Sequence, residues 1–188
     1  RSLQASNVSY YQSLNDLTLA QVTTLQSRPG ASKVLYIDYL AGVVTDTAWN
    51  IGGGPTTITY ADYSFDSDAT TFSLIDLQSM YAGWAESADD FAPFDVNVTT
   101  DLDVYNAVSD RNRSKIVATS TNWFGGGGVA YVNIYGIRDD DFYNIGWTFN
   151  RGFGSLGMTN SHEAGHQMGL VHDGTSNLEY YGGAGNSG

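Results

Sequence analysis

The 188-residue chain contains no cysteine, so it can form no disulfide bond and cannot close a metal site with thiolates. Basic residues are also scarce: 8 Lys and Arg stand against 20 Asp and Glu, and the formal net charge at pH 7 is −12. Nucleic acids and anionic membranes are recognised through basic patches, so this balance argues against both as partners. No run of about 20 apolar residues is present, which argues against a membrane-spanning helix.

Two common signs of a side-chain nucleophile are missing too. Cysteine is absent, and no Gly-x-Ser-x-Gly turn, which would present a nucleophilic serine, occurs in the chain. Histidine is nearly as scarce, because the chain has 3 and all of them lie at positions 162–172. These histidines are therefore the first candidates for a functional site.

The spacing of the histidines is that of a metal site. His162 and His166 are four residues apart, and on an α-helix this spacing brings both imidazoles to one face. Glu163 points to a different side and is free to hold a water molecule. His172 would lie roughly 15 Å further along a continuous helix, but Gly169 can adopt the left-handed conformation that ends a helix. Three imidazoles with an open fourth position are typical of catalytic zinc.

A simpler interpretation must be weighed against this one. A histidine on a helix is more often a surface or core residue than a ligand, and a bare HExxH pattern also arises by chance. Here the glycine and the third histidine agree with the pattern as well, and no histidine occurs elsewhere. A zinc site is the better interpretation.

The segment HEAGHQMGLVHD at positions 162–173 resembles the HExxHxxGxxHD signature of the metzincin zinc endopeptidases. The Asp after the third histidine is most similar to the adamalysin or reprolysin branch. The resemblance implies that His162, His166 and His172 bind one zinc ion and that Glu163 is the general base. It gives Asp173 a supporting role, in which its carboxylate hydrogen-bonds the backbone after the ligands. Adamalysins carry disulfides, so their absence here favours a bacterial member, secreted to the extracellular space.

The chemistry implied by this resemblance is hydrolysis of peptide bonds. Zinc held by three imidazoles lowers the pKa of its water toward 7 and polarises the scissile carbonyl. Glu163 would take a proton from that water and pass it to the leaving amine. The predicted activity is that of a zinc endopeptidase acting on extended protein or peptide substrates.

Family members bind substrate as an antiparallel strand added to the edge strand above the cleft, a form of β-augmentation. By its order in the chain, this strand is 129–135 here, which makes Val129, Ala130 and Tyr131 candidate substrate-binding residues. The four glycines at 125–128 either allow a close approach of the peptide or simply form a loose turn.

Calcium is a second cofactor to consider. Two acidic groups have suitable spacing: Asp62, Asp66 and Asp68 in one loop, and Asp139, Asp140 and Asp141 in another. Carboxylates at such spacing can collect a hard cation. More often they form turns or a solvated face, and neither group has an EF-hand pattern.

Apolar periodicity predicts an α+β domain. Strands are predicted at 34–40, 94–100, 115–119, 129–135 and 144–149, and helices at 71–88 and 156–168. This order, one strand, a helix, four strands and a helix, resembles that of metzincin catalytic domains. The resemblance implies a twisted five-stranded mixed sheet with two long helices, the second of which carries HExxH.

We expect one metallopeptidase catalytic domain over 1–188, with 31–172 as its upper subdomain and 173–188 as the start of an incomplete lower subdomain. Metzincins place a methionine turn after the third histidine, whereas Met80, Met158 and Met168 all precede His172. We expect a longer polypeptide or an associated C-terminal fragment of the same polypeptide to complete the cleft. A reduced variant is the alternative.

Two other functions stay open at this point. A non-catalytic extracellular binding module could keep zinc for stability, and its 13 Tyr and 4 Trp would suit a binding surface. In that case Glu163 would be dispensable, and removal of zinc would unfold the domain. A zinc hydrolase acting on something other than peptides is the third hypothesis, because HExxH alone does not define the substrate.

Overall fold

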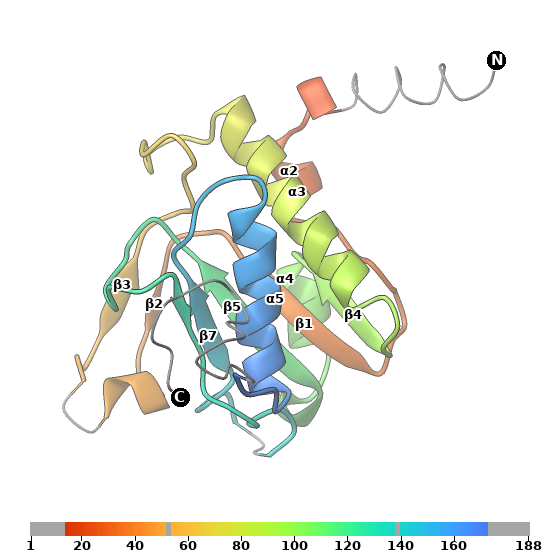
Figure 1. The fold of residues 1–188 in the computed structure, drawn as a ribbon, viewed down its shortest axis with the longest axis vertical. Helices are drawn as coiled ribbons and strands as arrows, with labels where there is room; N and C mark the ends of the chain where they lie inside the picture. The colour runs from red at the N-terminus through yellow and green to blue at the C-terminus, as the bar shows by residue number, and fades with distance from the viewer. Residues whose placement is uncertain (1–13, 52–53, 138–139, 173–188) are drawn as a thin grey trace, which may run out of the picture.

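A computed structural model describes residues 14–51, 54–137 and 140–172, and its centre is a five-stranded mixed sheet with the order β4-β1-β5-β7-β6 (Figure 1). The strands are β1 (Lys33–Asp38), β4 (Val96–Thr99), β5 (Arg113–Ala118), β6 (Gly128–Val129) and β7 (Ile145–Thr148). Four of them run parallel, and β6 pairs antiparallel with β7 at one edge. The predicted α+β class and five-stranded mixed sheet are confirmed.

Two long helices, α3 (Leu74–Asp90) and α5 (Ser155–Gln167), lie side by side on one face of this sheet (Figure 1). Glycine lets them approach closely, because a Cβ on Gly83 of α3 would lie 2.7 Å from the side chain of Leu156 on α5. The start of α3 is fixed by a capping box, in which the Ser73 hydroxyl accepts from the backbone of Asp76 and the Asp76 carboxylate accepts from the backbone of Ser73.

The remaining elements are short. They are α2 (Leu19–Val22), β2 (Gly42–Val44), η1 (Ala48–Asn50), β3 (Ile58–Tyr60), α4 (Leu102–Asn106) and η2 (Asp110–Asn112). The strands β2 and β3 form an antiparallel hairpin, which the sequence analysis missed. Each has three residues, too few for an alternating pattern to be recognised.

The alternation of side chains along β1 separates two cores. Leu35 and Ile37 are buried in the main core, under α3 and α5, while Val34 and Tyr36 pack with Tyr105 of α4 on the other face. A third cluster is aromatic and joins β7 to the β2–β3 hairpin. It contains Val44, Ile58, Tyr60, Val117, Ile145, Trp147 and Phe149, with Trp49 and Trp123 packed against it. The sheet is thus covered on both faces, which holds α5 in a defined place.

The predicted strand 129–135 is wrong beyond Val129. Its alternating apolar pattern suggested a strand, but Asn133 has a φ of 57°, in the left-handed region. The backbone N–H groups of Asn133, Ile134 and Tyr135 donate to carbonyls at the end of α5 instead of pairing with another strand. Tertiary contacts with the helix therefore override the strand preference of these residues.

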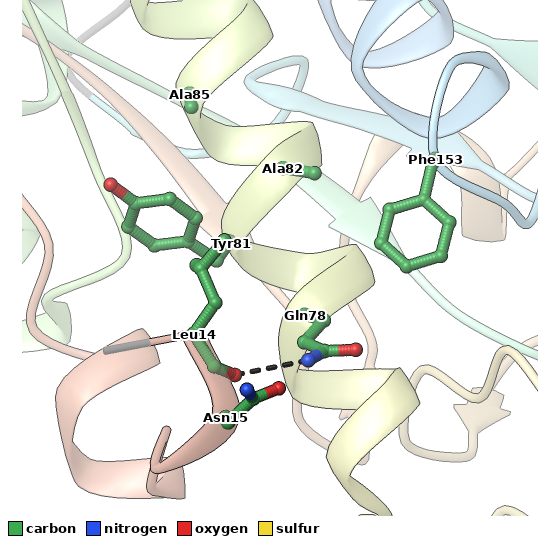
Figure 2. A pocket seen from close by; sticks show the side chains of 7 residues that line it. All are labelled: Leu14, Asn15, Gln78, Tyr81, Ala82, Ala85 and Phe153. Atoms are coloured by element: carbon green, nitrogen blue, oxygen red, sulfur yellow. Dashed lines mark hydrogen bonds between the residues drawn. The ribbon is translucent and has the colours of Figure 1, made fainter. Parts of the chain in front are cut away.

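The predicted subdomain boundary cannot be compared with the fold, because 173–188, including Asp173, lie outside the described residues. Among the residues that are described, no helix has the length and apolar character needed to cross a bilayer. A pocket of about 310 Å³ lies on α3, between Leu14 and Phe153 (Figure 2). There the amide of Gln78 donates to the carbonyl of Leu14, which ties the N-terminal segment to the helix.

Candidate metal centre

The three histidines come together at the C-terminal end of α5. His162 and His166 are one helical turn apart, and their ring centroids are separated by 4.4 Å. Nε2 of His172 lies 3.0 Å from Nε2 of His162 and 3.1 Å from Nε2 of His166. The predicted convergence of the three imidazoles is therefore confirmed.

A tight turn at the end of α5 makes this convergence possible. Gly169 has a φ of +100°, and its N–H donates to the carbonyl of His166 at 2.9 Å. The N–H of Leu170 donates to the carbonyl of Gly165 at 2.9 Å, which completes a Schellman motif. The chain then turns back toward the helix, so that His172 reaches the other two histidines. The predicted role of Gly169 is confirmed.

A hydrogen bond from Nδ1 of His166 determines which ring nitrogen is left to bind a metal. Nδ1 of His166 lies 2.7 Å from the carbonyl oxygen of Leu170. A carbonyl can only accept, so Nδ1 carries a proton, and Nε2 is the nitrogen that is left to bind a metal beside the other two histidines. Second partners of this kind fix the tautomer of metal-binding histidines.

The donor set fits zinc. Tetrahedral zinc with Zn–N distances of about 2.0–2.1 Å holds its nitrogen ligands about 3.3 Å apart. The two separations from Nε2 of His172, 3.0 and 3.1 Å, are close to this value. Burial, reinforced by the two neighbouring imidazoles, lowers the pKa of His162 to about 4. The ring is therefore neutral at pH 7, the form in which imidazole binds a metal.

Glu163 lies beside the three histidines but does not join them as a ligand. Its side chain is 5% exposed, and its Oε2 atom has no hydrogen-bond partner among the described residues. The carboxylate instead contacts the position of Gly128 on the edge strand β6. Burial raises the pKa of Glu163 to about 8. A buried carboxyl group with a strongly raised pKa next to a metal-binding cluster is a candidate for proton transfer.

Gln167 is a supporting residue that the sequence analysis missed. It is fully buried, its Oε1 accepts from the hydroxyl of Ser114, and its Nε2 donates to the carbonyl of Lys115 at 3.3 Å. These contacts tie the end of α5 to the central strand β5. Its spacing could have predicted its burial. Gln167 follows Glu163 by four residues, so both side chains lie on the same face of the helix, which is buried.

The segment after β6 closes the end of α5 from the other side. The N–H of Asn133 donates to the carbonyl of His166 at 2.8 Å, and the N–H of Tyr135 donates to the carbonyl of Gln167 at 3.0 Å. Such bonds satisfy carbonyls that have no partner at a helix end. They also connect the metal-binding turn to the edge of the sheet.

The three candidate substrate-binding residues lie at this edge. Val129 belongs to β6, and Ala130 and Tyr131 follow it. Val129 packs against the aromatic cluster, and the ring of Tyr131 lies 4.4 Å from that of Trp49, centroid to centroid. Both side chains are therefore engaged on the face of the sheet away from α5.

In the part of the chain that the structure describes, neither acidic loop gathers three metal ligands. Among the described residues, the three histidines are the single group of three His, Asp or Glu side chains that converge on one point. Asp66 and Asp68 accept hydrogen bonds from hydroxyls and amides of their own loop, and Asp62 accepts from the N–H of Ala41. In the other loop, 139 lies outside the described residues, and Asp141 forms an ion pair with Arg113 at 2.8 Å. The described residues thus give no support to calcium as a second cofactor.

A five-stranded mixed sheet, crossed by a helix that brings three histidines and a buried glutamate together, defines the metzincin class of metallopeptidases. The chain belongs to metallo-peptidase family M12B, reprolysin-like, whose family model matches residues 54–173. This match confirms the resemblance read from the motif and supports zinc-dependent proteolysis in general, with proteins or peptides as substrates. No curated protein and no solved structure matches the chain.

Proposed function

We propose that this chain is a zinc endopeptidase in which His162, His166 and His172 hold the metal and Glu163 is the general base. The observation that carries the proposal is the convergence of three imidazole Nε2 atoms beside a buried carboxyl group with a free oxygen. Secretion is part of the proposal and follows from the family resemblance.

The metal and Glu163 have different roles in the proposed reaction. Bound zinc supplies a Lewis acid that polarises the scissile carbonyl and acidifies water. Glu163 accepts the proton of the attacking water and delivers it to the nitrogen of the leaving amine. Burial raises the pKa of Glu163 in the metal-free site. A zinc ion held by the neighbouring histidines would favour the ionised carboxylate, which is the form that accepts a proton.

The substrate is expected to bind along β6 as an added strand. In the described sheet β6 pairs only with β7, so its other edge is available to an extended peptide. Val129, Ala130 and Tyr131 would contribute their backbone groups, since the side chains of Val129 and Tyr131 pack elsewhere. Recognition through backbone pairing favours broad tolerance of substrate sequence.

The proposal is tested by casein hydrolysis with the zinc-loaded protein and its Glu163→Ala variant. Both should hold one zinc, whereas the variant should lose roughly 10²–10⁴-fold in rate, the usual contribution of a general base. Asp90→Ala is the matched control, because it removes an exposed carboxylate from α3.

Equal rates for the parent and Glu163→Ala would remove Glu163 from the chemistry. A parent that binds zinc without hydrolysing casein, and that unfolds when zinc is chelated, would favour the non-catalytic module instead. Hydrolysis of an ester or a carbohydrate but not of casein would indicate another class of zinc hydrolase.

A further inference from the structure

The carboxylate of Glu163 occupies a slot that exists because position 128 has no side chain. A Cβ on Gly128 would lie 2.5 Å from Oε1 of Glu163 and 2.9 Å from its carboxyl carbon. Real Cβ atoms do not approach other atoms so closely, so any side chain at position 128 must displace a neighbour.

One wall of this slot is the methyl group of Thr159, which would lie 2.8 Å from the same Cβ. Thr159 cannot easily turn away. Its hydroxyl donates to the carbonyl of Ser155 and accepts from the amide of Asn150, both at 2.8 Å. The methyl group is therefore held in place by the hydrogen bonds of the hydroxyl on the same carbon.

The strand that carries Gly128 is also fixed. Gly128 pairs with Thr148 of β7, and the carbonyl of Gly127 accepts from the N–H groups of Phe149 and Asn150 at 2.8 and 3.1 Å. A shift of the edge strand away from α5 would break this pairing. The backbone at position 128 thus has little freedom to move.

The carboxylate is the least restrained of these neighbours. It stands at the far end of a flexible side chain, and its Oε2 atom makes no hydrogen bond. Packing against Gly128 and Thr159, rather than hydrogen bonding, sets where it lies. A side chain at position 128 would therefore move the carboxylate before it moved the strand or Thr159.

We propose that Gly128 is a positioning residue, which holds the carboxylate of Glu163 in its working place by leaving room for it. This inference rests on the proposed role of Glu163 as the general base. Residue 128 then controls the rate of hydrolysis without taking part in zinc binding.

The test compares zinc-loaded Gly128→Ala with Gly126→Ala in casein and peptide hydrolysis. At position 126 a Cβ would lie 3.2 Å from the exposed ring of Phe124 and 3.6 Å from the carbonyl oxygen of Gly128. Neither contact is as short as those at position 128, so this variant is the matched control. We expect Gly128→Ala to bind one zinc and to stay folded at the assay temperature, although the remaining 2.8 Å contact with Thr159 lowers its melting temperature. Its kcat should fall roughly 10²-fold with little change in KM, because a misplacement of about 1 Å has that effect.

A rescue variant separates this steric effect from a general disturbance of the edge strand. Thr159→Ser keeps the hydroxyl and removes the methyl group, so the new Cβ can relax toward the vacated space. The double variant Gly128→Ala/Thr159→Ser should recover part of kcat. A crystal structure of Gly128→Ala provides a readout that is independent of activity and should show the carboxylate displaced from the slot.

The inference is overturned if Gly128→Ala hydrolyses casein as fast as Gly126→Ala, or if it loses zinc or is unfolded at the assay temperature. An undisplaced carboxylate in the crystal structure would also overturn it. Failure of the proposed function looks different, because Glu163→Ala would then match the parent whatever residue stands at position 128.

Discussion

The candidate site has two halves that are built in different ways. His162, Glu163 and His166 stand on α5, whose end is tied to β5 through Gln167 and to the edge of the sheet through backbone hydrogen bonds. His172 lies beyond the turn, where the preceding residues Leu170 and Val171 are 67% and 65% exposed.

This difference indicates which half depends on the metal. The helical half is positioned by buried contacts that form when the domain folds, so it is preorganised without zinc. The third ligand is exposed and contacts the other two imidazoles. We therefore expect zinc to fix His172, while the helical half changes little when zinc is removed.

Substitution of single ligands gives the largest expected effects. His166→Ala and His172→Ala should each lower zinc affinity by more than about 100-fold, the upper range for the loss of a mere supporting residue. In the metal-free state, the two variants should differ in their free energy of unfolding. His166→Ala loses the bond to Leu170 and should lower the free energy of unfolding by about 1 kcal/mol, whereas His172→Ala should leave it unchanged.

Zinc titration and urea unfolding in the presence of a chelator measure these two effects. If metal-free His172→Ala is as destabilised as metal-free His166→Ala, the claim that only the helical half is held in place without zinc is wrong.

Gln167→Leu tests the anchor of the helical half. The change would leave Ser114 and the carbonyl of Lys115 without their amide partner, so the free energy of unfolding should fall by about 1–3 kcal/mol. Zinc affinity should fall roughly 10–100-fold, as for other residues that orient ligands. Gln78→Leu on α3, distant from the histidines, is the control, and equal zinc affinity in both variants would argue against the anchor.

The dependence of metal-free stability on pH is the smallest predicted effect. Glu163 has its pKa raised from 4.5 to about 8, so the folded state binds the extra proton and stability falls as pH rises through this range. His162 has its pKa lowered from 6.5 to about 4, so stability falls as pH drops from 6.5. The two effects oppose each other between pH 4.5 and 6.5.

Above pH 6.5 the contribution of Glu163 stands alone. We expect the metal-free protein to lose on the order of 1 kcal/mol between pH 6.5 and 8 in urea unfolding. Glu163→Gln, which cannot titrate, should flatten this decline. A decline of the same size in the variant would assign it to other groups.

The sequence predicted the elements with regular apolar spacing well. The helix expected at 71–88 is α3 (Leu74–Asp90), and the motif helix expected at 156–168 is α5 (Ser155–Gln167). The three imidazoles could be placed together because helical geometry and one glycine determine their positions.

The parts that depend on contacts between distant segments could not be predicted. The strand expected at 129–135 ends at Val129 because Asn133 bonds to the end of α5, 33 residues later in the chain. The contact of Glu163 with Gly128 likewise joins a helix to an edge strand, and no local pattern reports it. Gln167 was overlooked because a glutamine inside a metal-binding motif is easily taken for a solvent-exposed residue.

The most direct measurement is a stoichiometric zinc titration of the metal-free protein, followed by the rate of casein hydrolysis. Activity should rise linearly and level off at one zinc per chain. The same titration with His172→Ala should give no activity at one equivalent. Hydrolysis by the metal-free protein, or full activity in His172→Ala at one equivalent, would contradict the account.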